Sequence, residues 1–174
     1  ESLKWGGYDH LYESLPRLLT LWFSNGERIH EEEIKFNEKN HKSPTRSTSK
    51  RRGGKQQQYS AMSSAVTHRT NAKFSPAEVV QKMNHHVREL SNNLPSFLWY
   101  AALPQLVSRI THPSPTIWNV LKDILVNMVT SYPSQSLWHL MGVALSKMTQ
   151  RKQRATMVLD QAMKKDKALC KCIR

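Results

Sequence analysis

Two adjacent histidines, His85 and His86, and two cysteines, Cys170 and Cys172, are the residues best suited by type to hold a metal ion. Neighbouring positions on a helix point about 100° apart, whereas the two histidines of a zinc-binding helix stand four residues apart. A lone C-x-C near one end of the sequence has neither the spacing nor the partners of a zinc or disulfide framework. We therefore expect surface or half-buried histidines, free thiols and no metal site.

The sequence contains none of the motifs of a catalytic or cofactor-binding site. The glycine pairs at 6–7 and 53–54 lack the strand, turn and helix of a phosphate-binding loop. There is no H-R-D loop and no D-F-G, the catalytic signatures of protein kinases. The acidic run at 31–33 is typical of a solvated helix end rather than of a general acid–base pair. These 174 residues are therefore predicted to have no catalytic residue, no bound cofactor and no enzymatic activity.

A basic segment offers a different chemistry, contact with an anionic partner. Residues 39–73 carry nine Lys and Arg and no acid, within a chain of formal net charge +13. Arg51, Arg52 and Lys55 form the cluster KRRGGK, which resembles a nuclear-import or phosphate-contacting sequence; a solvated loop without a partner is the third interpretation. Because the segment 37–73 has hardly any large apolar residues, we predict a disordered insertion.

Residues 147–174 are a second basic segment, with nine Lys and Arg against Asp160 and Asp166. Proteins that bind single-stranded nucleic acid interleave aromatic and basic residues on one surface, but the tryptophans of this chain lie mostly in its neutral centre. The alternative function is a free-standing helical nucleic-acid-binding or protein-interaction module, using the basic loop and the basic last helix, with weak contact through the loop. No apolar run reaches the roughly 20 residues that span a bilayer, so no membrane association is expected.

Apolar periodicity and proline punctuation predict an all-α protein built from antiparallel helical hairpins, an α-solenoid of TPR-like or HEAT-like repeats. Helices are expected near residues 9–33, 76–92, 96–111, 115–131, 134–147 and 150–172. Pro104 kinks or splits the third of these helices, and Pro16 either kinks the first or follows a fresh start capped by Ser14. In domain terms, residues 1–36 hold the first helix, 37–73 the insertion and 74–174 the remaining repeats.

Two helix starts are marked by local signals. Ser75 and Glu78 are spaced as a capping box around Pro76, and Ser114 is a candidate N-cap before Pro115. After Pro115 the apolar residues recur at steps of three and one, which predicts a broad buried face. The residues expected in the core are Leu106, Leu121, Ile124, Leu125, Trp138 and Leu159.

Three segments together resemble a known family. They read LYESLPRLLTLWF at 11–23, LPSFLWYAALPQLVSRI at 94–110 and YPSQSLWHL at 132–140. In order and spacing they are similar to the C-terminal part of the FAT region of ATR checkpoint kinases, which belong to the phosphatidylinositol-3-kinase-related protein kinases. The resemblance covers residues 11–26 and 79–172, and it favours one kinked first helix across Pro16.

The resemblance implies a structural and regulatory collar in DNA-damage checkpoint signalling, immediately upstream of a kinase domain and packed on it in cis. ATP and Mg²⁺ would then bind in the kinase domain and not in these residues. The parent complex would include a partner subunit and would be located in the nucleus. Because such kinases favour Ser or Thr before Gln, Ser134 and Thr149 are candidate phosphosites. Ser134 stands near a helix start, where the helix dipole favours a phosphate.

Overall fold

The computed structural model of the chain describes residues 10–41 and 75–169, and within these ranges it contains helices and no strand. The helices are α2 (Leu11–His41), α3 (Pro76–Asn93), α4 (Ser96–Ala101), α5 (Leu103–Ser108), α6 (Pro115–Ser131), α7 (Pro133–Ala144), α8 (Thr149–Lys165) and the short 3-10 helix η1 (Lys167–Leu169). The predicted all-α, α-solenoid architecture is confirmed. None of the described helices is both long and apolar enough to cross a membrane.

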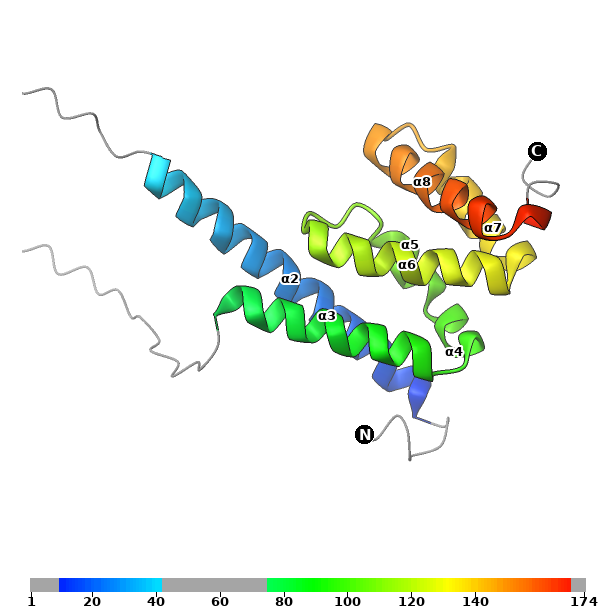
Figure 1. Cartoon of the computed structure of the whole chain (residues 1–174), viewed down its shortest axis with the longest axis horizontal. Coiled ribbons are helices and arrows are strands. Elements are labelled where there is room, and N and C mark those ends of the chain that lie inside the picture. Colours follow the sequence, from blue (N-terminus) through cyan, green and yellow to red (C-terminus); the bar gives the residue numbers. More distant parts are fainter. Residues whose placement is uncertain (1–9, 42–74, 170–174) are drawn as a thin grey trace, which may run out of the picture.

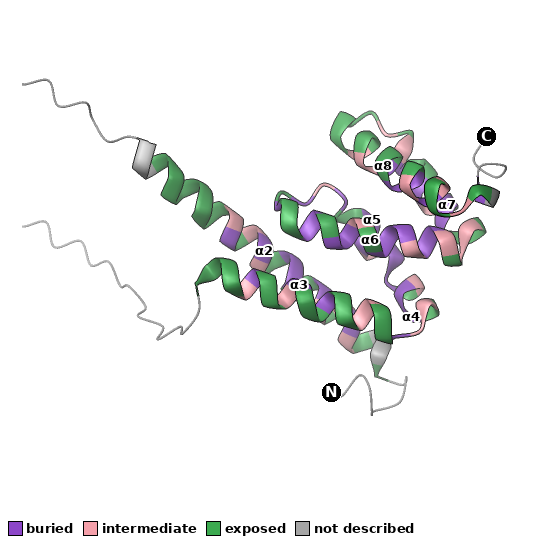
Figure 2. Cartoon of the chain, viewed as in Figure 1, coloured by how far each residue is buried: buried purple, intermediate pink, exposed green. Residues whose placement is uncertain are grey.

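The helices pack in an order that follows the chain (Figure 1). The first pair, α2 and α3, lies side by side, α6 packs on α3, and α7 and α8 pack on α6 and on each other. Of the two short helices, α4 lies below α6 in this view and packs on α2 and α6, whereas α5 is partly hidden behind α6 and packs on α6 and α7. Buried residues concentrate along α6 and on the inner faces of the helices around it (Figure 2).

Helix α3 begins with the capping box that its sequence predicts. The Ser75 hydroxyl accepts a hydrogen bond from the Glu78 amide at 3.3 Å, and the Glu78 carboxylate accepts one from the Ser75 amide at 2.8 Å. Two of the amides left without partners at a helix start are satisfied in this way. Helix α6 begins at Pro115 as predicted, but the Ser114 hydroxyl contacts Thr116 Oγ1 at 3.0 Å and caps no amide.

Helix α2 runs to His41, well past its predicted end at residue 33. Its second half carries ion pairs one turn apart, Arg28 with Glu32 at 3.3 Å and Glu31 with Lys35 at 3.8 Å. Such i,i+4 pairs each favour the helix by a few tenths of a kcal/mol, which explains why a polar segment stays helical here. Pro16 lies inside this single helix, as the family resemblance implied. Residues 42–73 of the predicted insertion lie outside the described ranges.

Three other predicted helices end early, at Ser108 rather than 111, at Ala144 rather than 147 and at Lys165 rather than 172. The helix predicted at 96–111 is split into α4 and α5 at Ala102, because Pro104 lacks an amide hydrogen and its ring conflicts with the preceding turn. The last helix, predicted to reach 172, stops at Lys165, where Asp166 takes an extended conformation. The turn that follows brings Leu169 into the core, where 2% of it is exposed.

Five of the six predicted core residues are buried, namely Leu106, Leu121, Ile124, Leu125 and Leu159. The prediction for Trp138 is wrong, since 84% of that residue is exposed. Helix α7 is apolar on nearly all sides, and it turns Leu137 and Leu140 inward instead. Helices α2 and α6 approach closely at Gly26, where a β-carbon would collide with Ile117 Cδ1.

Candidate functional site

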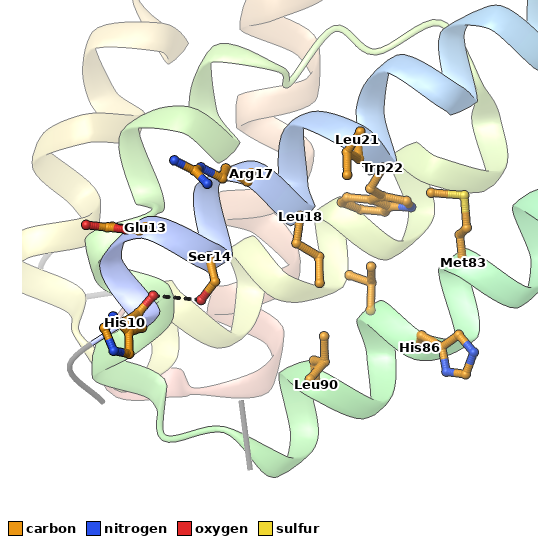
Figure 3. A pocket seen from close by; sticks show the side chains of 11 residues that line it. His10, Glu13, Ser14, Arg17, Leu18, Leu21, Trp22, Met83, His86 and Leu90 are labelled. Atoms are coloured by element: carbon orange, nitrogen blue, oxygen red, sulfur yellow. Dashed lines mark hydrogen bonds between the residues drawn. The ribbon is translucent and has the colours of Figure 1, made fainter. Parts of the chain in front are cut away.

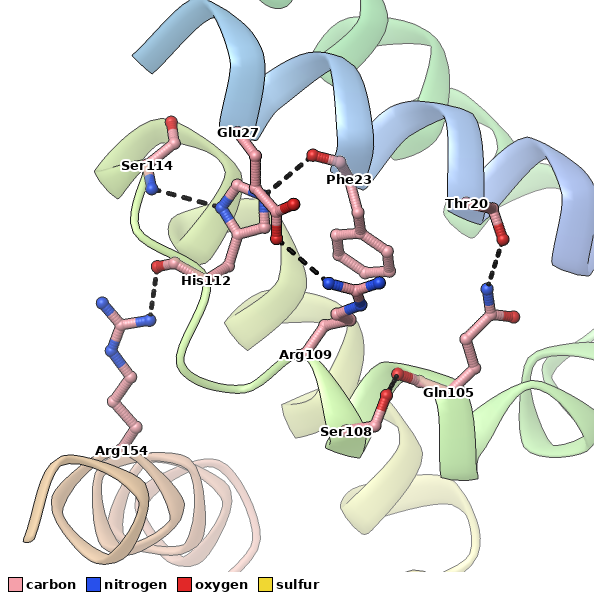
Figure 4. A network of polar contacts seen from close by, with 9 residues as sticks. All are labelled: Thr20, Phe23, Glu27, Gln105, Ser108, Arg109, His112, Ser114 and Arg154. Carbon is pink, nitrogen blue, oxygen red and sulfur yellow. Dashed lines mark hydrogen bonds and ion pairs between the residues drawn. The ribbon is translucent and has the colours of Figure 1, made fainter. Parts of the chain in front are cut away.

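A buried histidine in the turn between α5 and α6 holds that turn against α2 (Figure 4). His112 is 2% exposed, and its Nε2 lies 3.1 Å from the Phe23 carbonyl oxygen. Its Nδ1 accepts a hydrogen bond from the Ser114 amide at 3.2 Å. A carbonyl can only accept and an amide can only donate, so the two partners select the neutral imidazole with its hydrogen on Nε2.

The charge state of this imidazole follows from its burial. Desolvation lowers the pKa of His112 below its ordinary value of 6.5, and the Arg109 charge lowers it further. The Phe23 carbonyl and the Glu27 carboxylate act in the opposite direction, but they do not outweigh the loss of solvent. His112 is therefore neutral at physiological pH.

Helix α8 reaches the same turn through a single arginine. The Arg154 guanidinium donates hydrogen bonds at 2.8 Å to the carbonyl oxygens of Ile110 and His112. It also lies 4.5 Å from the centre of the Trp118 ring, within range of a cation–π contact. Burial lowers the pKa of Arg154, although a guanidinium stays charged in proteins. The turn is thus held by α2 on one side and by α8 on the other.

Two further side chains, on α5 and in the turn after it, also contact α2. The Gln105 amide donates to the Pro16 carbonyl at 3.1 Å and to the Thr20 hydroxyl at 3.0 Å. Arg109 pairs with Glu27 at 3.0 Å (Figure 4). We call the set of contacts made by Gln105, Arg109, His112 and Arg154 the polar joint. It offers no nucleophile or base to a substrate, but it fixes how the α2–α3 pair sits relative to α6 and α8.

An apolar groove runs along the flank of the α2–α3 pair (Figure 3). It has a volume of about 590 Å³, and its floor is formed by Leu18, Leu21, Trp22, Met83, Val87 and Leu90. His10, Glu13, Ser14, Arg17 and His86 contribute polar atoms to its walls. We call this feature the α2–α3 groove. All its lining residues after His10 belong to these two helices.

A second apolar surface lies on α7. Trp138, Met141 and Leu145 stand at i, i+3 and i+7, and their exposed fractions are 84%, 44% and 79%. Residues at this spacing share one helix face. We call them the α7 stripe. Large exposed apolar patches in soluble proteins mark interaction surfaces, and tryptophan is enriched among the residues that dominate interface energies.

The predicted phosphosites are exposed, whereas the predicted basic contacts lie outside the described residues. Ser134 is the second residue of α7 and Thr149 the first of α8. Arg51, Arg52 and Lys55 fall within 42–74, which the structure does not describe. Neither Ser134 nor Thr149 belongs to the polar joint or lines the α2–α3 groove.

The two adjacent histidines of α3 are exposed and share one carboxylate. His85 and His86 lie 3.6 and 3.4 Å from Glu89. Among the described residues no three His, Cys, Asp or Glu side chains are grouped so that they could hold a metal ion. Cys170 and Cys172 lie outside the described ranges.

The basic residues of α8 are divided between its two ends. Lys152 stands near the start and Lys164 near the end, roughly 18 Å apart at the helical rise of 1.5 Å per residue. Arg154, between them, is used within the fold, and Lys165 donates to Asn127 at 2.7 Å. These residues do not form one continuous basic stripe of the kind that follows a nucleic-acid backbone.

Sequence reasoning missed the polar joint and both apolar surfaces. His112 and Arg154 bind backbone carbonyls of residues up to 89 positions away, and every residue has a carbonyl, so no residue type marks the partner. The α2–α3 groove depends on how two helices separated by the insertion meet. Only the exposure of Trp138 could have been suspected from the sequence, because α7 has more large apolar residues than one buried helix face can hold.

Comparison with known proteins places the chain in a family. A family model described as serine/threonine-protein kinase ATR-like, HEAT repeats, matches residues 82–173. Protein kinase rad3 of Schizosaccharomyces pombe is 31% identical over 154 residues, which is 88% of this chain and 5% of the relative. The serine/threonine-protein kinases ATR of Drosophila melanogaster and Arabidopsis thaliana are 25% and 28% identical, each over 91% of this chain and 4% of the relative.

The chain thus spans about one twentieth of the length of these relatives. No solved structure matches it significantly. The family match covers α6, α7 and α8, most of α3 and the turn that carries His112. The resemblance inferred from the sequence is confirmed: the chain belongs to the ATR-like serine/threonine-protein kinase family, in its HEAT-repeat region.

Proposed function

We propose that this chain is a collar segment, the FAT-like part of an ATR-like serine/threonine kinase that acts in DNA-damage checkpoint signalling. In this role its helices lie upstream of the kinase domain and pack on it in cis. They hold the catalytic lobes in one arrangement, and activators shift the balance between two arrangements. Its relatives are named as protein kinases, and in this proposal the helices of this chain supply the mechanical part of such an enzyme.

The observation that carries the proposal is the α7 stripe. A tryptophan that is 84% exposed, followed by Leu145 at 79%, is costly to leave in water. The described part of the chain leaves the stripe open, because α7 buries Leu137 and Leu140 instead. In this proposal the stripe packs on the kinase domain of the parent chain.

The polar joint gives the collar the stiffness that the proposal needs. Hydrogen bonds to charged donors contribute more than neutral ones, about 1.5–3 kcal/mol each, and Arg154 makes two of them to one turn. A load placed on α7 would pass through α8 and Arg154 to that turn, and through His112 to α2. The two ends of the helix array would therefore move together.

The remaining parts of the function belong to the parent protein. ATP and Mg²⁺ would bind in its kinase domain, and a partner subunit would complete the complex in the nucleus. Arg51, Arg52 and Lys55 would serve nuclear import or a weak, salt-sensitive nucleic-acid contact. Changing all three to Ala separates these roles, because loss of nuclear accumulation indicates import and loss of salt-sensitive binding indicates contact. If both properties persist, the cluster belongs to a solvated loop.

The experiment that tests the collar is steady-state kinetics of the full-length parent kinase carrying Trp138→Ala. The expected result is an altered kcat with little change in the KM for ATP, because the nucleotide site lies elsewhere. Phe36→Ala is the matched control, since Phe36 is an aromatic residue 64% exposed on α2, away from the stripe. Equal kcat values for Trp138→Ala, Phe36→Ala and the unmodified kinase would refute a role for the stripe.

A further inference from the structure

The α2–α3 groove is suited to an apolar occupant rather than to a small polar ligand. Small-molecule sites place a few convergent polar groups around an apolar pocket. Here the polar groups nearest the floor are already paired: Trp22 Nε1 donates to Asn84 at 2.8 Å, and the Ser14 hydroxyl donates to the His10 carbonyl at 2.8 Å. Leu18, Met83 and Leu90 point into the open space instead (Figure 3).

The shape of the groove indicates a helix as its occupant. Two packed helices present ridges of side chains at i, i+3 and i+4 with a depression between them, into which the ridge of a third helix fits. Leu18 and Leu21 on α2, and Met83, Val87 and Leu90 on α3, have this spacing. The exposed charges of Glu13 and Arg17 stand one helical turn apart on the wall. They would pair with a basic and an acidic residue that are similarly spaced on the occupant.

The source of the helix follows from the order in which the array is stacked. In a solenoid each repeat contacts its neighbours along the chain. From α2 and α3 the array proceeds through α6 to α7 and α8, so the groove lies at the end nearest the N-terminal side. Relatives of this chain are about twenty times longer, so they contain ample sequence for further repeats.

We propose that the α2–α3 groove receives an amphipathic helix of the parent kinase that precedes α2 in sequence. The helix places apolar residues at i, i+3 or i+4, and i+7 against the groove floor, with its charged residues facing Glu13 and Arg17. This proposal depends on a longer parent chain, but it does not depend on the collar role proposed for α7. The groove could therefore be occupied whether or not Trp138→Ala alters kcat, so each proposal can fail without the other.

The first test compares Leu21→Glu in the isolated chain and in the full-length parent. Leu21 is 63% exposed, so the substitution should leave the melting temperature of the isolated chain unchanged. In the parent the same side chain is covered, and the added charge should increase the rate of proteolytic cleavage around α2 about tenfold or more. Phe36→Glu, at 64% exposure on the same helix outside the groove, should change neither quantity. Equal cleavage rates for the two parent variants would overturn the proposal.

The second test identifies the occupant. A photo-crosslinking amino acid at position 21 of the full-length parent should form a crosslink, identified by mass spectrometry, to a peptide of the parent that lies before residue 1 of this chain. The same group at position 36 should give none of this product. A crosslink to the kinase domain, to residues 1–9, to a second copy of the chain or to another protein would overturn the proposal, and so would the absence of any product.

Discussion

His112 and Phe23 are hydrogen-bonded across 89 residues of sequence, with the buried imidazole Nε2 3.1 Å from the Phe23 carbonyl oxygen. Their rings also lie 5.7 Å apart. The contact joins the first helix of the array to the turn that starts α6, and Arg154 joins the same turn to α8. One neutral histidine therefore sits at the centre of the packing between the two ends of the array.

The stability of the isolated chain should depend on the charge of His112. Because burial lowers its pKa in the folded state, the unfolded chain binds a proton first as the pH falls. The stabilising contribution is complete above the unfolded pKa of about 6.5 and is lost as the pH falls from there through the lower folded pKa. The charged side chains that act on the imidazole are Glu27, which raises its pKa, and Arg109, which lowers it. Urea unfolding at about pH 7.5 and pH 5.5 measures the loss.

Two glutamine variants isolate this effect. His112→Gln should cost about 1–3 kcal/mol at neutral pH, because it weakens two buried hydrogen bonds, and should remove the His112 part of the pH dependence. His85→Gln, at an exposed position on α3, is the matched control and should change the free energy of unfolding at neutral pH by less than about 0.5 kcal/mol. A pH dependence that is the same in all three proteins would contradict the assignment.

Leu121→Ala should destabilise the chain by about 2–5 kcal/mol, as expected for a large-to-small change at a position with no exposure. Leu125→Ala should behave alike, because Leu125 is equally buried on α6. Leu145→Ala is the matched control at 79% exposure, and it should shift the free energy of unfolding by less than about 0.5 kcal/mol. If all three variants have the same free energy of unfolding as the unmodified chain, α6 is not the centre of the core.

Asn84→Ala should cost about 1–3 kcal/mol, because it leaves the buried indole nitrogen of Trp22 without its partner. The lost bond, at 2.8 Å, is a buried polar contact inside the α2–α3 interface. Asn92→Ala, exposed on the same helix, is the control and should be nearly neutral. Chemical denaturation measures both variants, and equal midpoints would show that the bond contributes nothing.

Local signals predicted local structure well. The capping box at Ser75 and the proline at 115 each mark the observed start of a helix, because capping acts within one turn. The apolar stripe after Pro115 correctly predicted the buried face of α6. The extension of α2 to His41 was missed because composition suggested a loop from residue 37, whereas charge pairs one turn apart maintain the helix before it.

Long-range relations were not predictable in the same way. Periodicity identifies apolar positions, but it cannot say which face is buried when a helix is apolar on most sides, and the burial of Trp138 was wrongly predicted for this reason. Likewise the sequence does not distinguish Arg154 from the other basic residues of its helix, because its two carbonyl partners are set by the tertiary structure. The family could therefore be identified from the sequence, whereas the candidate site could be identified only from the tertiary packing.

The exposed hydroxyls of Ser134 and Thr149 permit phosphorylation by a kinase that selects Ser or Thr before Gln. A phosphate on Ser134 would lie in the first turn of α7, where the helix dipole favours a negative charge. We expect both sites to be modified when the active parent kinase is incubated with ATP, and Ser134→Ala with Thr149→Ala to remove the label. Phosphopeptide mass spectrometry decides the question, with Ser136, which is fully buried, as the unmodified control.

The most direct test of the collar is the turnover of the full-length parent kinase carrying Leu121→Ala, assayed at a temperature where the variant remains folded. If as little as about 1.4 kcal/mol of the lost packing energy reaches the active site, kcat changes about tenfold. The account predicts such a change in kcat with the KM for ATP nearly unchanged, and no change for Phe36→Ala, an exposed position on α2 away from the α7 stripe. An unchanged kcat in Leu121→Ala, although the variant is measurably destabilised, would contradict the account.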